Sequence, residues 1–155
     1  MSTSVGALAA ILVLVHLTLA AVWLGSMVYS LVVVQPRVAR FFPDERQRED
    51  FLLELASGNR WPVAGVICAL LLTASGLAAL VPQRVVAYGA VAVLYAAAGT
   101  VFCNVSWRHW PARVFASANE LAGFRRRLRW QAWIMLGLVS TAFVVALAAS
   151  AGMVA

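Results

Sequence analysis

The first apolar run of the chain contains residues 16–29, HLTLAAVWLGSMVY, and the fold and the candidate site are both predicted from this stretch. At the pitch of an α-helix, His16, Ala20, Trp23 and Met27 fall at positions i, i+4, i+7 and i+11, so they share one face. An imidazole inside a membrane helix is costly unless it faces a partner, a cavity or a ligand. The stretch therefore predicts a membrane helix with a functional face around His16.

Four uncharged runs organise the 155-residue chain, which is 63% hydrophobic and 12% charged, with a mean hydropathy of +0.87. Each run exceeds the roughly 20 residues that cross a hydrocarbon core, and the alternating pattern of barrel strands is absent. We predict one all-α domain, residues 1–155, a polytopic membrane protein built as a four-transmembrane-helix bundle. The expected helices are about 5–34, 61–81, 85–107 and 130–154.

The charges are distributed unevenly between the two sides of this bundle. Eleven of the twelve arginines lie in the loops 37–60 and 108–129, and only Arg84 lies in the short turn on the other side. The positive-inside rule then predicts a protein integral to the cytoplasmic (inner) membrane, with both long loops cytoplasmic and both termini outside. This topology explains the net charge of +6, and no nucleic-acid partner is predicted.

Both long loops are expected to be helical. Residues 44–57 have an amphipathic pattern and predict a short surface helix, which either rests on the lipid headgroups or docks a partner. The second loop predicts a helical extension that runs into the fourth helix. Its arginines either bind anionic lipid or only fix the topology: Arg125, Arg126, Arg127 and Arg129.

The second and third helices are joined by the short turn Pro82-Gln83-Arg84, which predicts an antiparallel hairpin. Small residues recur along both helices, and such faces let two backbones approach closely. We expect the helices to meet through these residues: Gly65, Cys68, Ser75, Gly76 and Ala79 on the second helix, and Gly89, Ala92, Ala96, Gly99 and Cys103 on the third.

Depth in the membrane groups the candidate ligands into two layers. Counting about 1.5 Å per residue from Val34 puts His16 roughly 27 Å from the cytoplasmic boundary, level with Tyr88. The same count puts Met27, Cys68 and Cys103 in an inner layer, about 6 to 10 Å from that boundary. Imidazole, thiolate and thioether ligands suit copper, so His16, Met27, Cys68 and Cys103 are the candidate metal ligands.

The same residues also have structural interpretations. His16 could be a hydrogen-bonded structural histidine, and cysteine and methionine are also good packing residues. The third-helix stripe of Tyr88, Tyr95, Phe102 and His109 could line a flat aromatic cofactor or simply fill the bundle. His16, Trp23 and Tyr88 are the candidate cofactor-binding residues. No catalytic residue is assigned, because all six acids lie in the loops.

The motif His16-x6-Trp23-Leu24-Gly25, with Thr73-Ala74-Ser75-Gly76-Leu77 closing the second helix, resembles the CopD-type copper resistance membrane domain. It is also similar to the HemJ-type membrane proteins. The first resemblance implies copper uptake or resistance, and the second implies haem b bound through His16 in an oxidoreductase. HemJ-type proteins carry a functional lysine on the third helix, whereas this chain has no lysine.

We therefore expect a CopD-like integral membrane protein that binds or transports copper. The alternatives are a haem-binding HemJ-like oxidoreductase and a non-catalytic structural membrane subunit. A homodimer is a further expectation, because two copies could bring two His16 side chains to one ligand.

Overall fold

The structure, a computed structural model, describes residues 3–109 and 118–154. These residues are helical throughout most of their length, and no strand occurs among them. The elements are, in order, α1 (Thr3–Tyr29), the π-helical η1 (Ser30–Val34), α2 (Gln35–Phe41), α3 (Glu45–Gly58), α4 (Arg60–Leu80), the 3-10 turn η2 (Pro82–Arg84), α5 (Val85–Cys103), the π-helical η3 (Asn104–His109) and α7 (Ala118–Ser150).

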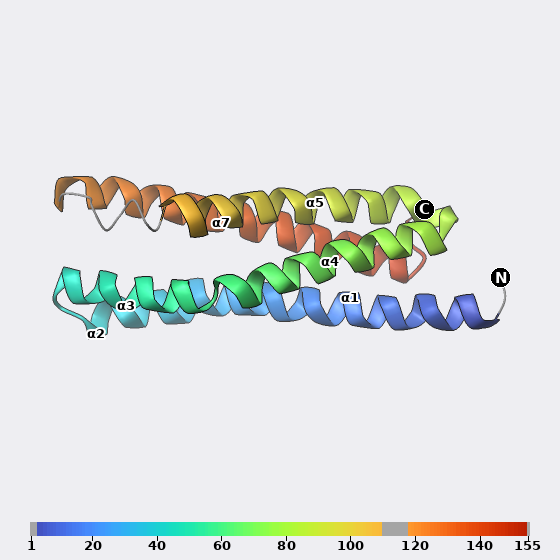
Figure 1. Cartoon of the computed structure of the whole chain (residues 1–155), viewed down its shortest axis with the longest axis horizontal. Coiled ribbons are helices and arrows are strands. Elements are labelled where there is room, and N and C mark those ends of the chain that lie inside the picture. The colour runs from blue at the N-terminus through green and yellow to red at the C-terminus, as the bar shows by residue number, and fades with distance from the viewer. Residues whose placement is uncertain (1–2, 110–117, 155) are drawn as a thin grey trace.

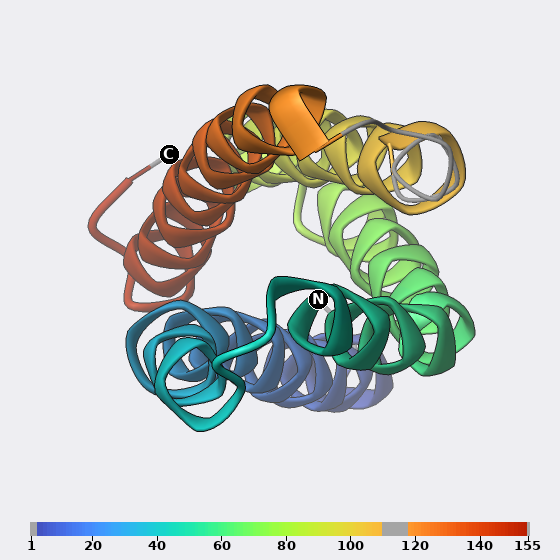
Figure 2. The same ribbon diagram turned by 90° about the vertical axis from the view of Figure 1, so that its left-hand side faces the viewer.

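Four long helices form an antiparallel bundle, as the sequence predicts (Figure 1). Each packs against two neighbours, in the ring order α1, α4, α5, α7, which is visible along the bundle axis in Figure 2. All four are long and apolar enough to cross a membrane. The arginine-rich segments lie at one end, called here the basic end, and α1 begins and α7 ends at the opposite end.

The first helix does not stop at the predicted residue 34 but continues through Pro36 to Phe41. A proline inside a helix lacks an N–H and clashes with the preceding turn. The π-helical segment Ser30–Val34 accommodates this defect by widening one turn, and Gln35 donates its backbone N–H to the carbonyl of Ser30. The membrane helix is therefore extended beyond Val34 at the basic end.

The loop helix α3 begins and ends as predicted. Asp44 is its N-cap and accepts a hydrogen bond from the Arg46 backbone N–H at 3.0 Å, and the helix ends at Gly58. It runs alongside α2 in the direction of the bundle axis (Figure 1). Part of the amphipathic face, Leu52 and Leu55, lines a cleft described below.

The α4–α5 hairpin forms as predicted, but the small-residue faces do not mediate it. Cys68, Ser75, Ala96 and Cys103 are exposed on the outside of the bundle. Larger side chains fill the interface instead, and of the glycines only Gly99 is closely opposed, since a Cβ there would lie 3.1 Å from Ile67. The buried residues of the two helices are mainly Ile67, Leu70, Thr73, Ala74, Leu77, Tyr88, Val91, Tyr95 and Ala98.

The fourth membrane helix is longer at its basic end than the predicted span. α7 runs without interruption from Ala118 to Ser150, which confirms a helical extension into the membrane span; the predicted part of it at residues 112–117 lies outside the described residues. At the opposite end the helix stops at Ser150, before the predicted residue 154, because Gly152 adopts a left-handed conformation with φ 79°. Arg84 donates to the carbonyl of Ser150 at 3.4 Å, which places a cation at the negative end of the helix dipole.

Candidate functional site

The predicted face of α1 is the buried face of that helix. His16 is 1% exposed, and Ala20, Trp23 and Met27 are also buried. Trp23 and Met27 belong to the main core, with Leu70, Tyr95 and Val139 from the other three membrane helices. The spacing of these residues, and nothing longer-range, was enough to predict which side of α1 points inward.

His16 is held by a hydrogen bond to the neighbouring helix. Its Nδ1 lies 2.7 Å from Oγ1 of Thr73 on α4. Oγ1 of Thr73 also lies 2.8 Å from the carbonyl oxygen of Ala69 and 3.1 Å from that of Leu70, so its one hydroxyl proton can be donated to its own helix. In that arrangement the hydroxyl accepts from the Nδ1–H of His16, because carbonyl oxygens can only accept, and the lone pair is on Nε2.

The Nε2 atom of His16 is buried and has no hydrogen-bond partner among the described residues. The hydroxyl of Tyr95 on α5 is in the same condition, although its ring lies against the imidazole edge-on with centroids 5.6 Å apart. Trp23 also packs against Tyr95, with 6.1 Å between the two ring centroids. Two contacting rings in the bundle interior therefore carry a ring nitrogen and a hydroxyl without a hydrogen-bond partner among the described residues. Buried polar atoms of this kind call for an explanation.

The imidazole lies deeper in the bundle than the count from Val34 predicts. His16 contacts Thr73, which lies twelve residues along α4 from Trp61, or about 18 Å at the rise of an α-helix. The residue twelve positions from His16 on α1 is Val28, so Trp61 is level with about Val28 and not with Val34. The prediction that His16 is level with Tyr88 is wrong, because His16 contacts Thr73 and Tyr95.

Tyr88 does not share the site with His16. It is buried in a second cluster nearer the opposite end, with Leu77, Ala87 and Ala149. The tyrosine that contacts His16 is Tyr95, two turns further along the same stripe.

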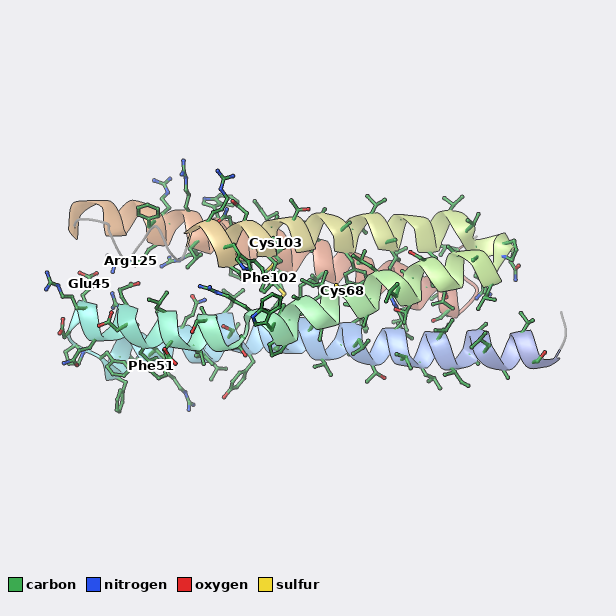
Figure 3. All side chains as sticks on the ribbon, viewed as in Figure 1. Glu45, Phe51, Cys68, Phe102, Cys103 and Arg125 are labelled. Carbon is green, nitrogen blue, oxygen red and sulfur yellow. The ribbon has the colours of Figure 1, made fainter. Side chains whose placement is uncertain are left out.

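The sulfur-containing candidates do not form one enclosed set. Met27 is buried in the core, whereas the free thiols of Cys68 and Cys103 are exposed on the outer surfaces of α4 and α5. Figure 3 shows the two cysteines on these neighbouring helices. Within the described part of the chain, no group of three or more His, Cys, Asp or Glu side chains could hold a metal ion. His16 and Met27 are the predicted ligands that face the interior together.

Thr73 and Tyr95 are the site residues that sequence reasoning missed. Thr73 is part of the Thr73–Leu77 motif, and Tyr95 is part of the third-helix stripe, so both positions had a signal. The motif and the stripe do not show which of their side chains faces His16. That contact depends on how α4 and α5 are rotated about their axes relative to α1.

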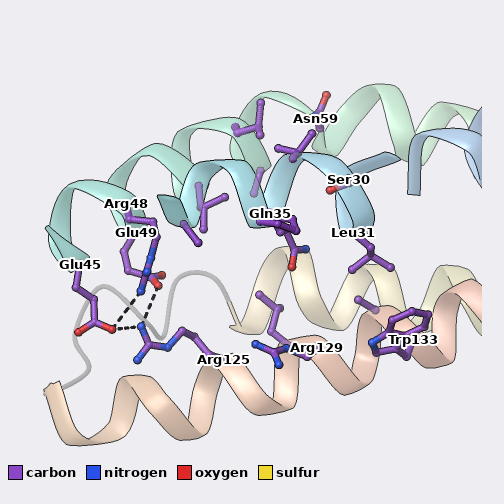
Figure 4. Close-up of a pocket in the computed structure, with 18 residues that line it drawn as sticks. Ser30, Leu31, Gln35, Glu45, Arg48, Glu49, Asn59, Arg125, Arg129 and Trp133 are labelled. Atoms are coloured by element: carbon purple, nitrogen blue, oxygen red, sulfur yellow. Dashed lines mark hydrogen bonds and ion pairs between the residues drawn. The ribbon is translucent and has the colours of Figure 1, made fainter. Parts of the chain in front are cut away.

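A second polar feature lies at the basic end, between α3 and α7. Arg125 of α7 donates a hydrogen bond to Glu45 and lies 3.9 Å from Glu49, and Arg48 is 3.2 Å from Glu45. Figures 3 and 4 show Glu45 and Arg125 pointing toward each other. The hydrogen bond from Arg125, with its positive charge, lowers the pKa of Glu45 below the ordinary value.

These ion pairs close one end of a cleft of about 810 Å³. Its walls come from η1 and α2, from α3 and from α7 (Figure 4). Along α7 the lining residues include Arg125, Arg129 and Trp133, which follow each other at i, i+4 and i+8. The cleft thus has a charged part near Arg125 and a mixed aromatic and apolar part near Trp133.

Comparison with known proteins gives no match to a family model, to a curated protein or to a solved structure.

Proposed function

We propose that this protein binds copper(I) inside its four-helix bundle, with Nε2 of His16 as a ligand. The observation that carries the proposal is a buried imidazole whose Nδ1 lies 2.7 Å from Oγ1 of Thr73 and whose Nε2 has no partner among the described residues. Imidazole nitrogen is a suitable copper ligand. Histidines that bind metals usually donate their other N–H to a fixed acceptor, which orients the ring.

Met27 is the second ligand in this proposal. Its thioether is buried on the same face of α1, eleven residues and about 16 Å nearer the basic end. The two atoms are too far apart to hold one ion, so they would act as successive stations for a copper ion that is cargo. Few ligands at each station keep binding weak enough for release, which transport requires. Cys68 and Cys103 face outward and are left out of this path.

The proposed orientation puts the basic end in the cytoplasm and the two chain ends outside, in the cytoplasmic membrane. Support comes from the arginines, which gather at one end of the bundle. The arginine bias of short loops sets the orientation of membrane helices during insertion. In this orientation copper enters from the outside, reaches His16 near mid-membrane and moves toward Met27.

Packing around His16 favours a single ion over a haem. Ala20, Trp23, Thr73 and Tyr95 are all nearly inaccessible, and Nε2 itself is shielded. A porphyrin bound to this nitrogen would have to displace several of these side chains, whereas an ion requires a shift of only one or two. In the haem alternative the ligand atom is also Nε2 of His16. The visible spectrum distinguishes the two, because only haem has a Soret band.

The test is a visible spectrum and a metal analysis of the purified protein, wild type against His16→Ala. Copper near one ion per chain without a Soret band, lost in His16→Ala, supports the proposal. A Soret band lost in the same variant replaces copper with haem. If neither is found after growth with added copper, and His16→Ala only lowers stability, the histidine is a structural residue and the proposal fails. Cys68→Ser with Cys103→Ser is the control and should retain the copper.

A further inference from the structure

The cleft at the basic end has the lining of a site for an amphiphile. Its apolar surface includes Leu31 and Val34 from the extended first helix, and Leu52 and Leu128 from α3 and α7. Trp133 lies in the same wall and is 53% exposed, which is typical of a tryptophan at a membrane interface. A purely polar ligand would leave this apolar surface in contact with water.

Among the described residues, the charges that line the cleft do not balance. Glu45 and Glu49 both lie against Arg125, and Arg48 adds a further pair to Glu45. Arg129, one turn closer to Trp133, forms no ion pair among the described residues and is exposed toward the cleft. The cleft therefore presents an unneutralised guanidinium next to its apolar part.

The position of Arg129 matches the headgroup level of a bilayer. It lies on α7 immediately before Trp130 and one turn before Trp133, where the charged extension passes into the uncharged membrane span. A second hollow on the outside of α7, lined by Arg125, Arg126, Arg129, Trp130 and Trp133, adjoins the cleft through shared residues. A lipid of the surrounding leaflet can thus reach the cleft along a surface of arginine and tryptophan.

We infer that the cleft binds one anionic phospholipid, with its phosphate at Arg129 and an acyl chain along Leu31, Val34 and Trp133. Basic pockets between helices near the membrane surface bind such headgroups. On the first helix this site begins at Leu31, fifteen residues or about 22 Å from His16, and it does not depend on copper binding. It assigns a role to the arginine run beyond fixing the topology of the chain.

The experiment is native mass spectrometry of the full chain in detergent, with phosphatidylglycerol or phosphatidylcholine of the same acyl chains. The wild type should retain one phosphatidylglycerol per chain and much less phosphatidylcholine. Arg129→Gln should reduce retention of phosphatidylglycerol about five-fold, the effect of one basic side chain at an anionic surface. Arg37→Gln, an exposed arginine of α2 outside the cleft, changes the net charge equally and should leave retention unchanged.

Three results would overturn the inference. One is equal retention of the two lipids by the wild type. Another is an equal loss in Arg37→Gln and Arg129→Gln, which would mean that only net charge matters. The third is displacement of the lipid by glycerol phosphate at a similar concentration. That result would show that the site recognises the phosphate alone and that the acyl chain does not contribute to binding.

Discussion

Nδ1 of His16 lies 2.7 Å from Oγ1 of Thr73, which joins α1 to α4 across 57 positions of sequence near the centre of the bundle. The bond has two consequences that can be separated experimentally. It holds two membrane helices together, and it leaves the other ring nitrogen free for a ligand.

Replacement of Thr73 by valine tests the first consequence. Thr73→Val keeps the shape of the side chain but leaves the Nδ1–H of His16 without an acceptor in an apolar interior. We expect the free energy of unfolding in detergent to fall by about 1 kcal/mol, as for other interhelical hydrogen bonds in membranes. Thr100→Val is the matched control, because Thr100 is exposed and bonds only to its own helix at Ala96. Equal losses in the two variants would show that the His16–Thr73 bond contributes nothing.

Removal of the Tyr95 hydroxyl, unlike removal of the Thr73 hydroxyl, should not lower the stability of the protein. The Tyr95 hydroxyl is buried without a hydrogen-bond partner among the described residues, and such a group costs about 1 to 3 kcal/mol. Tyr95→Phe should therefore leave the metal-free protein as stable as the wild type or more stable, measured by thermal unfolding. Tyr29→Phe, at an exposed tyrosine, should have no effect. A marked loss of stability in Tyr95→Phe would mean that the hydroxyl has a partner in the folded protein.

Much of this arrangement was predictable from the sequence, and the errors have physical causes. The four spans and the inward face of α1 follow from the length of the apolar runs and from the 3.6-residue period around His16. The level of His16 was wrong because Val34 was taken as level with Trp61, whereas the first helix continues past Pro36 to Phe41. Thr73 and Tyr95 could not be assigned because contacts across helices depend on rotations that no single helix encodes. The small-residue faces of α4 and α5 were misassigned for the same reason.

The ion pair between α3 and α7 predicts a dependence on pH. The hydrogen bond from Arg125 lowers the pKa of Glu45 from its ordinary value of 4.5, so the stabilising contribution is present above pH 4.5. It is lost as the pH falls through the lowered value. Spin labels at Gln47→Cys and Arg127→Cys, in a Cys68→Ser/Cys103→Ser background, should give a narrow distance distribution at neutral pH that broadens on acidification.

Glu45→Gln provides the control for this titration. The glutamine side chain stays neutral and cannot form the ion pair with Arg125. The spin-label distance distribution of this variant should therefore be broader than that of the wild type at neutral pH, and it should change less on acidification. A wild-type distribution that is unchanged down to pH 3 would show that Glu45 and Arg125 do not hold the two helices together.

The proposed orientation can be tested with topology reporters. Alkaline phosphatase is active only outside the cytoplasm, so a fusion after Ala155 should be active, and a truncated fusion after Gln47 should be inactive. The physical reason is the concentration of arginines at one end of the bundle. The reverse pattern would place the basic end outside and would invert the direction proposed for copper.

The central claim is that Nε2 of His16 carries a free lone pair that binds copper(I). Nitrogen-15 NMR of histidine-labelled protein tests it most directly, because the chain has two histidines and His109→Gln leaves only His16. We predict a proton on Nδ1, an unprotonated Nε2, and a shift of the Nε2 resonance when copper(I) is added. A proton on Nε2, or an Nε2 resonance that copper(I) leaves unchanged, would contradict the account.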